Sequence, residues 1–449
     1  MDVILLSRLQ FALTVGFHYI FPTLSIGLSI LLVIMEGAYI RTRNPLYRQI
    51  TEFWIRVFGL IFAIGVATGI VLEFEFGTNW ATYSRFVGDV FGSALAAEGM
   101  FAFFLESGFL AIVLFGWNRV RPGVHYFATI MVAFGAHFSA VWIIVANSWM
   151  QTPAGYHLVG EGLKVRAEIT DFWAMVFNPS TVDRLSHSII GAWQAGAFLV
   201  ISISAYYLLK NKHQEFSRAS IRFALILAII ASLGQLMTGH SSAVGVSKNQ
   251  PEKLASLEGH FEAEAPADMY LFGWVNEENE NVTGLKIPGF LSYILSGKND
   301  TKIPGLRSFP RMDWPPVNIV FQAYHFMVAI GLMLIAVSII SGFLYWRGTL
   351  FNARKWLILL IFSVLAPQIA NQLGWITAEV GRQPWIVYRL LRTYKGVSAT
   401  VSAELVLTSL ILFTLIYFLL FALFIFLLDR KIKYGPVEEE VVGQARADI

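Results

Sequence analysis

The sequence contains no cysteine, and this absence excludes several kinds of site. Thiolate-held iron–sulfur clusters, covalently attached c-type haem, cysteine-ligated copper and disulfides all need a thiol. Histidine is also scarce, with nine residues in 449 and no two adjacent. A haem–copper centre, which needs several histidines including an adjacent pair, is therefore excluded as well. Any metal site must use imidazole, thioether or carboxylate ligands.

Charged residues are few too, at 14% of the chain against 56% hydrophobic residues, and the mean hydropathy is +0.60. This balance is typical of a membrane protein. Apolar runs of about 20 residues, the length that crosses a bilayer, predict an all-α polytopic fold with nine transmembrane helices. The predicted spans are 11–35, 54–72, 90–115, 125–147, 185–209, 219–239, 317–346, 356–377 and 404–428. No basic region or cleavage site accompanies the first span, so we expect it to be retained.

Lysine and arginine orient these spans, because short cation-rich loops stay in the cytoplasm. Such loops follow spans one, three, five and seven, which predicts an N-terminus outside and a C-terminus in the cytoplasm. The connection after span eight breaks this rule, since it would face outward and yet carries Arg382, Arg389, Arg392 and Lys395. Cations kept there indicate an anionic partner, for example the carboxylates of a bound cofactor.

This topology divides the chain into four segments: helices one to six in 1–239, an outward loop in 240–316, helices seven to nine in 317–430 and a cytoplasmic tail in 431–449. The loop contains the only long hydrophilic stretch and is acidic. A loop of this length is usually either functional or disordered.

Three candidate iron ligands lie near the outer ends of their predicted spans, namely His18, His187 and Met327. Taken singly, each has a plainer interpretation, because a membrane histidine can bond to a neighbouring helix or lie at the interface, and methionine commonly packs. Together they indicate more, since histidine and methionine form a recognised axial pair for low-spin haem. Glu379, just before residues 381–385 at the outer end of span eight, is a further candidate functional group.

Two carboxylates, Glu98 and Glu106, fall within span three. Eight residues of α-helix would place them about 12 Å apart along the axis and on roughly the same side. Because lone carboxylates in lipid are costly, a proton relay is the leading interpretation, and pairing with buried cations is the alternative. Ser139 and Asn147 in span four could extend such a path or simply form interhelical hydrogen bonds.

Several longer motifs make the chain similar to a known family. They occupy residues 7–13, 65–69, 73–80, 102–107, 145–151 and 374–385. On these motifs the chain resembles subunit I of cytochrome bd quinol oxidase from residue 2 to about residue 430. The resemblance implies a quinol substrate and three haems: a low-spin b haem, a high-spin b haem and the chlorin haem d.

The resemblance also assigns the candidate ligands. His187 and Met327 match the axial ligands of the low-spin haem, while His18 and Glu379 each match the ligand of one high-spin haem. Which of those two holds haem d stays open. Glu98 would lie beside the high-spin pair, and Glu106, with Ser139, would lie on a proton route from the cytoplasm. The other residues that match positions near the haems are Arg8, Trp375 and Arg382.

The outward loop corresponds to the family's quinol loop in its short form, and residues 250–258 resemble the quinol-binding segment. Lys253 would donate a hydrogen bond to quinol and Glu258 would accept a proton, whereas the plainer interpretation of both is a solvated charged face. Two residues depart from the family pattern: His325 stands where an arginine is familiar near the low-spin haem, and His137 stands where an asparagine is familiar.

The implied function is a terminal oxidase that oxidises quinol outside and reduces dioxygen to water with cytoplasmic protons, without pumping. The expected partners are a second oxidase subunit and a small single-helix subunit, and no nucleic acid, in a bacterial or archaeal cell membrane. The alternatives are a haem-free transporter or channel, for which inverted repeats or matching broken helices are typical, and a purely structural membrane subunit.

Overall fold

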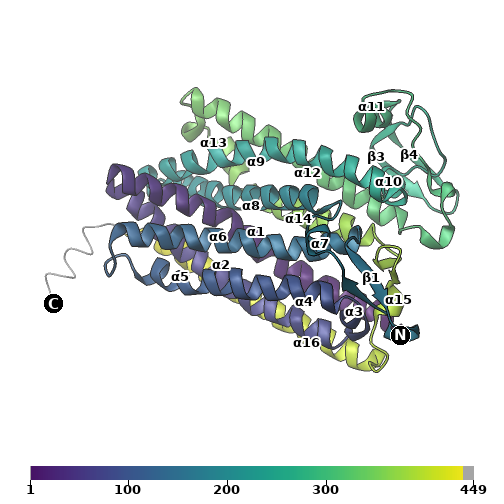
Figure 1. The fold of residues 1–449 in the computed structure, drawn as a ribbon. Coiled ribbons are helices and arrows are strands. Elements are labelled where there is room, and N and C mark those ends of the chain that lie inside the picture. The colour runs from purple at the N-terminus through teal and green to yellow at the C-terminus, as the bar shows by residue number, and fades with distance from the viewer. Residues whose placement is uncertain (1, 438–449) are drawn as a thin grey trace.

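The computed structural model describes residues 2–437 and confirms the predominantly helical, nine-span fold within that range (Figure 1). The spanning helices are α1 (Val3–Thr42), α2 (Pro45–Gly77), α4 to α5 (Gly88–Phe115), α6 (Pro122–Gln151), α8 (Thr181–Leu209), α9 (Gln214–Asn249), α12 (Val317–Trp346), α13 to α14 (Arg354–Val380) and α16 (Ala403–Tyr434). Of the predicted tail, 431–449, the first residues still belong to α16, and 438–449 lie outside the described residues.

Two of the spans are interrupted. In the third, α4 (Gly88–Ala97) and α5 (Phe104–Phe115) flank a π-helix, Glu98–Phe103. The predicted separation of Glu98 and Glu106 along one regular α-helix, and their placement on one side of it, is therefore wrong, because hydrogen bonds in a π-helix join residues i and i+5. In the eighth, α13 (Arg354–Phe362) stops before α14 (Leu365–Val380). Pro367 explains the break, since its ring would clash with the carbonyl four residues earlier in a continuous helix.

Close packing of α1 and α8 forms the centre of the bundle. A Cβ atom on Gly27 would lie 2.1 Å from the Ala192 carbonyl oxygen, and one on Gly196 would lie 2.3 Å from the Gly27 carbonyl carbon. Small residues at such crossings let membrane helices approach closely. Around this contact, large side chains including Leu28, Phe58 and Phe198 fill one continuous apolar core.

Strands occur in the connections, as three antiparallel hairpins. They are β1 (Tyr156–Val159) with β2 (Arg166–Ile169), β3 (Met269–Asn276) with β4 (Asn281–Ile287), and β5 (Trp385–Val387) with β6 (Leu391–Arg392). Short helices complete the connections: α3 (Ala81–Phe86), α7 (Phe172–Val176), α10 (Pro251–Glu258), α11 (Phe290–Ser296), α15 (Thr393–Gly396) and 3₁₀ turns at Gly162–Lys164, Leu306–Ser308, Arg311–Asp313 and Leu350–Asn352.

The segment predicted as the outward loop is folded. α9 continues to Asn249, so the boundary expected at residue 240 falls inside a helix. Beyond it, α10 and β3 of the β3–β4 hairpin pack on α12, while α11 packs on α9 (Figure 1). Phe261, Leu306 and Phe321 belong to a small apolar core there. We call the end of the bundle that carries α10 and the start of α1 the loop end (Figure 1).

Candidate functional site

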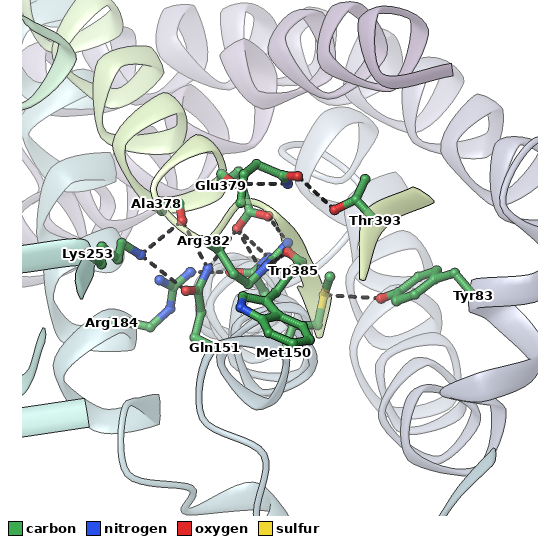
Figure 2. A network of polar contacts seen from close by, with 12 residues as sticks. Tyr83, Met150, Gln151, Arg184, Lys253, Ala378, Glu379, Arg382, Trp385 and Thr393 are labelled. Atoms are coloured by element: carbon green, nitrogen blue, oxygen red, sulfur yellow. Dashed lines mark hydrogen bonds and ion pairs between the residues drawn. The ribbon is translucent and has the colours of Figure 1, made fainter. Parts of the chain in front are cut away.

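Glu379 lies in the last turn of α14 and is the centre of a polar network at the loop end (Figure 2). Its carboxylate pairs with Arg382, which lies three residues later, just beyond the end of α14. It also accepts hydrogen bonds from Asn147 Nδ2 at 3.1 Å and from Gln151 Nε2 at 3.2 Å, both on α6. Even so, 17% of the Glu379 side-chain surface stays uncovered by protein.

Two more cationic side chains complete this network. Arg184, in the first turn of α8, donates to Asn147 Oδ1 and, at 3.2 Å, to Ser148 Oγ. Lys253, from α10, donates to Gln151 Oε1 at 3.1 Å and to the Ala378 carbonyl at 2.9 Å (Figure 2). We call Arg184, Lys253, Glu379 and Arg382 the Glu379 network. Sequence reasoning missed Arg184, whose only signal was a cation at the outer start of a span.

The Glu379 network carries more positive than negative charge. Burial lowers the pKa of Lys253 well below its usual value, with the nearby Arg184 adding to the effect. Even with Lys253 neutral, two guanidinium groups face one carboxylate. Because buried charge is costly unless it is paired, the excess fits an anionic ligand such as the propionates of haem.

The arginines after span eight divide into two groups, so the predicted anionic partner applies to only one of them. Arg389 pairs with Glu252 at 3.5 Å, and Arg392 pairs with Asp313 at 2.5 Å, so loop carboxylates and not a cofactor balance these two. Of the three arginines only Arg382 belongs to the Glu379 network. The fourth cation, Lys395, lies over the ring of Tyr394. The acidic loop thus explains much of the departure from the cation rule.

His18 and His187 each have one ring nitrogen in a hydrogen bond and the other available. His18 Nδ1 lies 2.9 Å from Thr68 Oγ1, and His187 Nδ1 lies 3.1 Å from Thr238 Oγ1. Within the described range 2–437 the side-chain hydrogen bonds of both rings are made at Nδ1, and His18 also bonds to the backbone of Gly65, whose carbonyl accepts from Thr68. A neutral imidazole binds a metal through its free nitrogen, so both rings fit the role of a haem ligand.

Three other histidines within the spans use both ring nitrogens. His125 contacts Glu36 Oε1 and the Val113 carbonyl. His137 contacts the Ala133 carbonyl and accepts from Trp193 Nε1. The third, His325, contacts two carbonyls, of Phe321 and of Tyr270 in β3, and so ties the β3–β4 hairpin to α12. The two departures from the family pattern, at 137 and 325, therefore have structural partners here.

α14 carries both Trp375 and Glu379 and lies beside Met327 of α12. A Cβ atom on Gly374 would lie 3.1 Å from Met327 Sδ, so α14 is bare where the sulfur of α12 approaches it. The Trp375 ring lies 5.7 Å from the Tyr19 ring, next to His18 on α1. Within residues 2–437 no three His, Asp or Glu side chains converge as a metal site. The candidate ligands are thus distributed over separate helices, one to each.

Arg8 lies half-buried on α1, the helix that also carries His18. Over the described part of the chain it forms no salt bridge, although its charge interacts with that of Asp2 at the start of α1. The resemblance matches Arg8 to a position near the haems.

The two carboxylates of span three have different surroundings. Glu98, in the π-helix, accepts a 2.7 Å hydrogen bond from Ser139 Oγ on α6. Glu106, on α5, is buried. Neither forms an ion pair with any residue in the range 2–437, so the alternative of pairing with buried cations finds no support. Ser139, predicted to lie on the same proton route as Glu106, is the donor to Glu98.

The quinol-segment residues are buried, so the interpretation of a solvated charged face is wrong. Lys253 is 3% and Glu258 is 2% exposed. Tyr324 on α12, three residues before Met327, interacts with the Glu258 carboxyl group. Burial raises the pKa of the Glu258 carboxyl to about 7. α10 therefore connects two candidate ligand helices, α14 through Lys253 and α12 through Glu258.

The family description "Cytochrome bd terminal oxidase subunit I" matches residues 6–436. The chain belongs to this family. Cytochrome bd subunit I is a terminal oxidase subunit, and membership implies haem cofactors, quinol oxidation and dioxygen reduction. It also agrees with the spanning helices in making this a multi-pass membrane protein of bacteria.

Individual relatives cover almost the whole chain. Cytochrome bd ubiquinol oxidase subunit 1 of Bacillus subtilis is 38% identical over 97% of this chain and 94% of its own. Cytochrome bd-II ubiquinol oxidase subunit 1 of Escherichia coli is 35% identical, with 97% of both chains covered. The solved bd oxidase from Geobacillus thermodenitrificans superposes with a TM-score of 0.89 at 31% identity, over 97% of this chain and 99% of that one.

Proposed function

We propose that this subunit oxidises quinol at the loop end, releases the quinol protons outside, and takes protons from the cytoplasm for reduction of dioxygen to water, without pumping. The cofactors are a low-spin b haem held by His187 and Met327, and a high-spin b haem and haem d held by His18 and Glu379. When bound, the haems supply electron transfer and an iron site for dioxygen.

The observation that carries the proposal is the position of α10. Lys253 donates to the Ala378 carbonyl, one residue before Glu379, and Glu258 contacts Tyr324, one turn before Met327. A quinol bound at α10 would therefore lie beside two helices that carry proposed ligands.

Quinol oxidation requires a proton acceptor, and Glu258 is suited to that role. A general base works best when its pKa lies near the working pH, and burial brings the pKa of Glu258 to about 7. Lys253, whose amine is held by Gln151 and Ala378, orients the second polar group of the quinol. In this role the two residues bind the substrate and remove its proton.

The charge surplus of the Glu379 network supports cofactor binding by this chain. Arg184 and Arg382 pair with haem carboxylates, and Arg8 provides a further cation on α1. Trp375, whose ring lies 5.7 Å from that of Tyr19, would contact the haem held by His18. These residues bind and orient the cofactor and exclude water from it.

Protons for dioxygen reduction enter from the end opposite the loop end. Glu106 on α5 receives them, and Glu98, held by Ser139 on α6, passes them on toward the high-spin pair. Lone buried carboxylates in membrane helices are suited to this transfer. The cation-rich connections at that end support its assignment as the cytoplasmic side, with the N-terminus outside.

The proposed assembly is a heterodimer with the second oxidase subunit, and a small single-helix subunit is a further proposed partner. Residues 240–316 act as the short quinol loop between the helices of 1–239 and 317–430. α16 supports a lipid or subunit contact, because it exposes Ile411, Leu415 and Phe418.

The test is a reduced-minus-oxidised optical spectrum of the purified complex. We expect b-type bands and a red-shifted chlorin band, and their absence would refute the proposal. In His187→Ala or Met327→Ala the low-spin b signal should disappear while the dioxygen-binding haem remains. Retention of the low-spin signal in both variants would show that other residues hold that haem.

A further inference from the structure

The rings of His18 and His187 each contact a threonine followed by a glycine on a neighbouring helix. His18, on α1, contacts Thr68 of α2, and His187, on α8, contacts Thr238 of α9. His18 also bonds to the backbone of Gly65 on α2, a contact that His187 lacks among the described residues. In both cases the residue after the threonine is glycine. A Cβ atom on Gly69 would lie 3.2 Å from His18 Cε1, and one on Gly239 would lie 3.6 Å from His187 Cε1. A threonine–glycine pair thus bonds each ring at Nδ1 and leaves room beside Cε1.

Each threonine hydroxyl already has acceptors for its single hydrogen. Thr68 Oγ1 lies 3.0 Å from the carbonyl oxygens of both Ile64 and Gly65. Thr238 Oγ1 lies 3.0 Å from the Gly234 carbonyl oxygen. Since a hydroxyl has one hydrogen to donate and two lone pairs, the bond to the imidazole runs from Nδ1–H to the threonine oxygen.

We infer that Thr68 and Thr238 are positioning residues that hold His18 and His187 in the Nδ1–H tautomer, with the Nε2 lone pair directed to a haem iron. The inference rests on the proposed ligand roles of the two histidines. A hydrogen bond from the distal ring nitrogen fixes the orientation of a metal-bound histidine and raises its basicity.

His137 provides the contrast within the same bundle. Its Nδ1 also donates, to the Ala133 carbonyl at 2.7 Å, but its Nε2 accepts from Trp193 Nε1 at 2.8 Å. The same tautomer is therefore used there for an interhelical bond. What distinguishes His18 and His187 is the threonine–glycine pair on the next helix together with a free Nε2.

The test compares valine and serine variants at each threonine in the assembled oxidase, by optical redox titration of the individual haem signals. Valine keeps the shape but loses the acceptor, while serine keeps the hydroxyl. Thr238→Val should shift the low-spin midpoint potential to a more positive value, because a less basic ligand stabilises the oxidised iron less. Thr238→Ser should restore the original potential.

Thr68→Val should instead alter only the high-spin signal of the haem on His18 and leave the low-spin potential unchanged. Thr51→Val is the matched control, because Thr51 is also buried on α2 and donates to the carbonyl of Tyr47 at 2.7 Å. Over the described residues it bonds to no histidine, so neither potential should move. Complete loss of the haem band in a valine variant also supports the inference, provided that the serine variant at the same position keeps that band.

Two results would overturn the inference. One is an unchanged potential in both valine variants, and the other is a shift of both haem signals by either variant or by Thr51→Val. His187→Ala separates this failure from failure of the proposed function. If that variant loses the low-spin signal while Thr238→Val leaves the potential unchanged, His187 is a ligand and Thr238 has no positioning role. If it keeps the signal, the ligand assignment itself is wrong.

Discussion

Two buried charge clusters in this molecule differ in how their charges balance. In the half away from the loop end, Glu36 Oε1 lies 2.7 Å from His125 Nδ1, and its other oxygen accepts a 2.6 Å bond from Thr129. His125 Nε2 contacts the Val113 carbonyl, so every polar atom of this pair has a partner. In the Glu379 network, two guanidinium groups and an amine surround one carboxylate.

The comparison separates a structural cluster from a binding cluster. A buried pair that satisfies itself needs nothing further and joins α1 to α6. A buried cluster with surplus positive charge is stable only when an anion completes it. Burial of charge therefore does not identify a functional site, whereas an unbalanced charge does.

The largest expected effect comes from Glu379→Gln, which removes the only carboxylate of the Glu379 network. We expect loss of one high-spin haem signal and a fall in the rate of dioxygen reduction by at least about 100-fold. Residues that only support a metal ligand cost up to about 100-fold when they are removed, and loss of the ligand itself should cost no less. Haem content and oxygen consumption of the purified complex measure this. Normal haem content with a normal rate would contradict the ligand role.

Glu258→Gln should lower quinol oxidation by about 100-fold or more, the range for losing a general base. Because the pKa of Glu258 is raised to about 7 by burial, the carboxyl is protonated below that pH and cannot accept a proton. The rate of the unchanged protein should thus rise with pH through about 7 and then level off. The variant should lose this rise, and a pH profile that keeps it would assign the base elsewhere.

Glu36→Gln breaks the balanced pair and should act on stability instead. Breaking a buried pair costs about 3–5 kcal/mol of unfolding free energy, which lowers the thermal unfolding midpoint while the haem spectrum of the folded complex stays normal. The double variant Glu36→Leu with His125→Leu should recover much of the loss, since apolar replacement of a whole pair is often neutral. A changed haem spectrum without destabilisation would overturn this contrast.

The smallest effect is expected for Arg389→Ala. Arg389 pairs with Glu252 at 3.5 Å and its side chain is 60% exposed. The Glu252 carboxylate is buried, but it keeps a 2.7 Å hydrogen bond from the Tyr388 hydroxyl when Arg389 is removed. We therefore expect this long pair to contribute about 1 kcal/mol, as an exposed pair does. Thermal unfolding and oxidase activity should both stay near their original values. Arg382→Ala is the matched comparison, because it removes a buried guanidinium of the Glu379 network and should reduce haem content. Equal effects of the two would remove the distinction between balanced and surplus cations.

Several features were predictable because they depend on local sequence. Spans of about 20 apolar residues are visible one at a time, and the positions of His18, His187, Met327 and Glu379 within them are a matter of counting. The folded loop was less visible, since its hairpin and α10 are stabilised by packing against α12. The π-helix at Glu98–Phe103 carried no recognised signal, and the Glu98–Ser139 contact depends on how α6 lies beside it.

The sequence by itself determined the membrane class, the spans and the candidate ligands, because hydropathy, cation distribution and residue type act over short stretches. Only the tertiary structure decided which cations share a carboxylate and which histidine nitrogen stays free. Arg184 and Glu379 are far apart in the chain, and Thr238 is 51 positions from His187. Such contacts arise from helix packing, and packing is a property of the whole bundle and of no single segment.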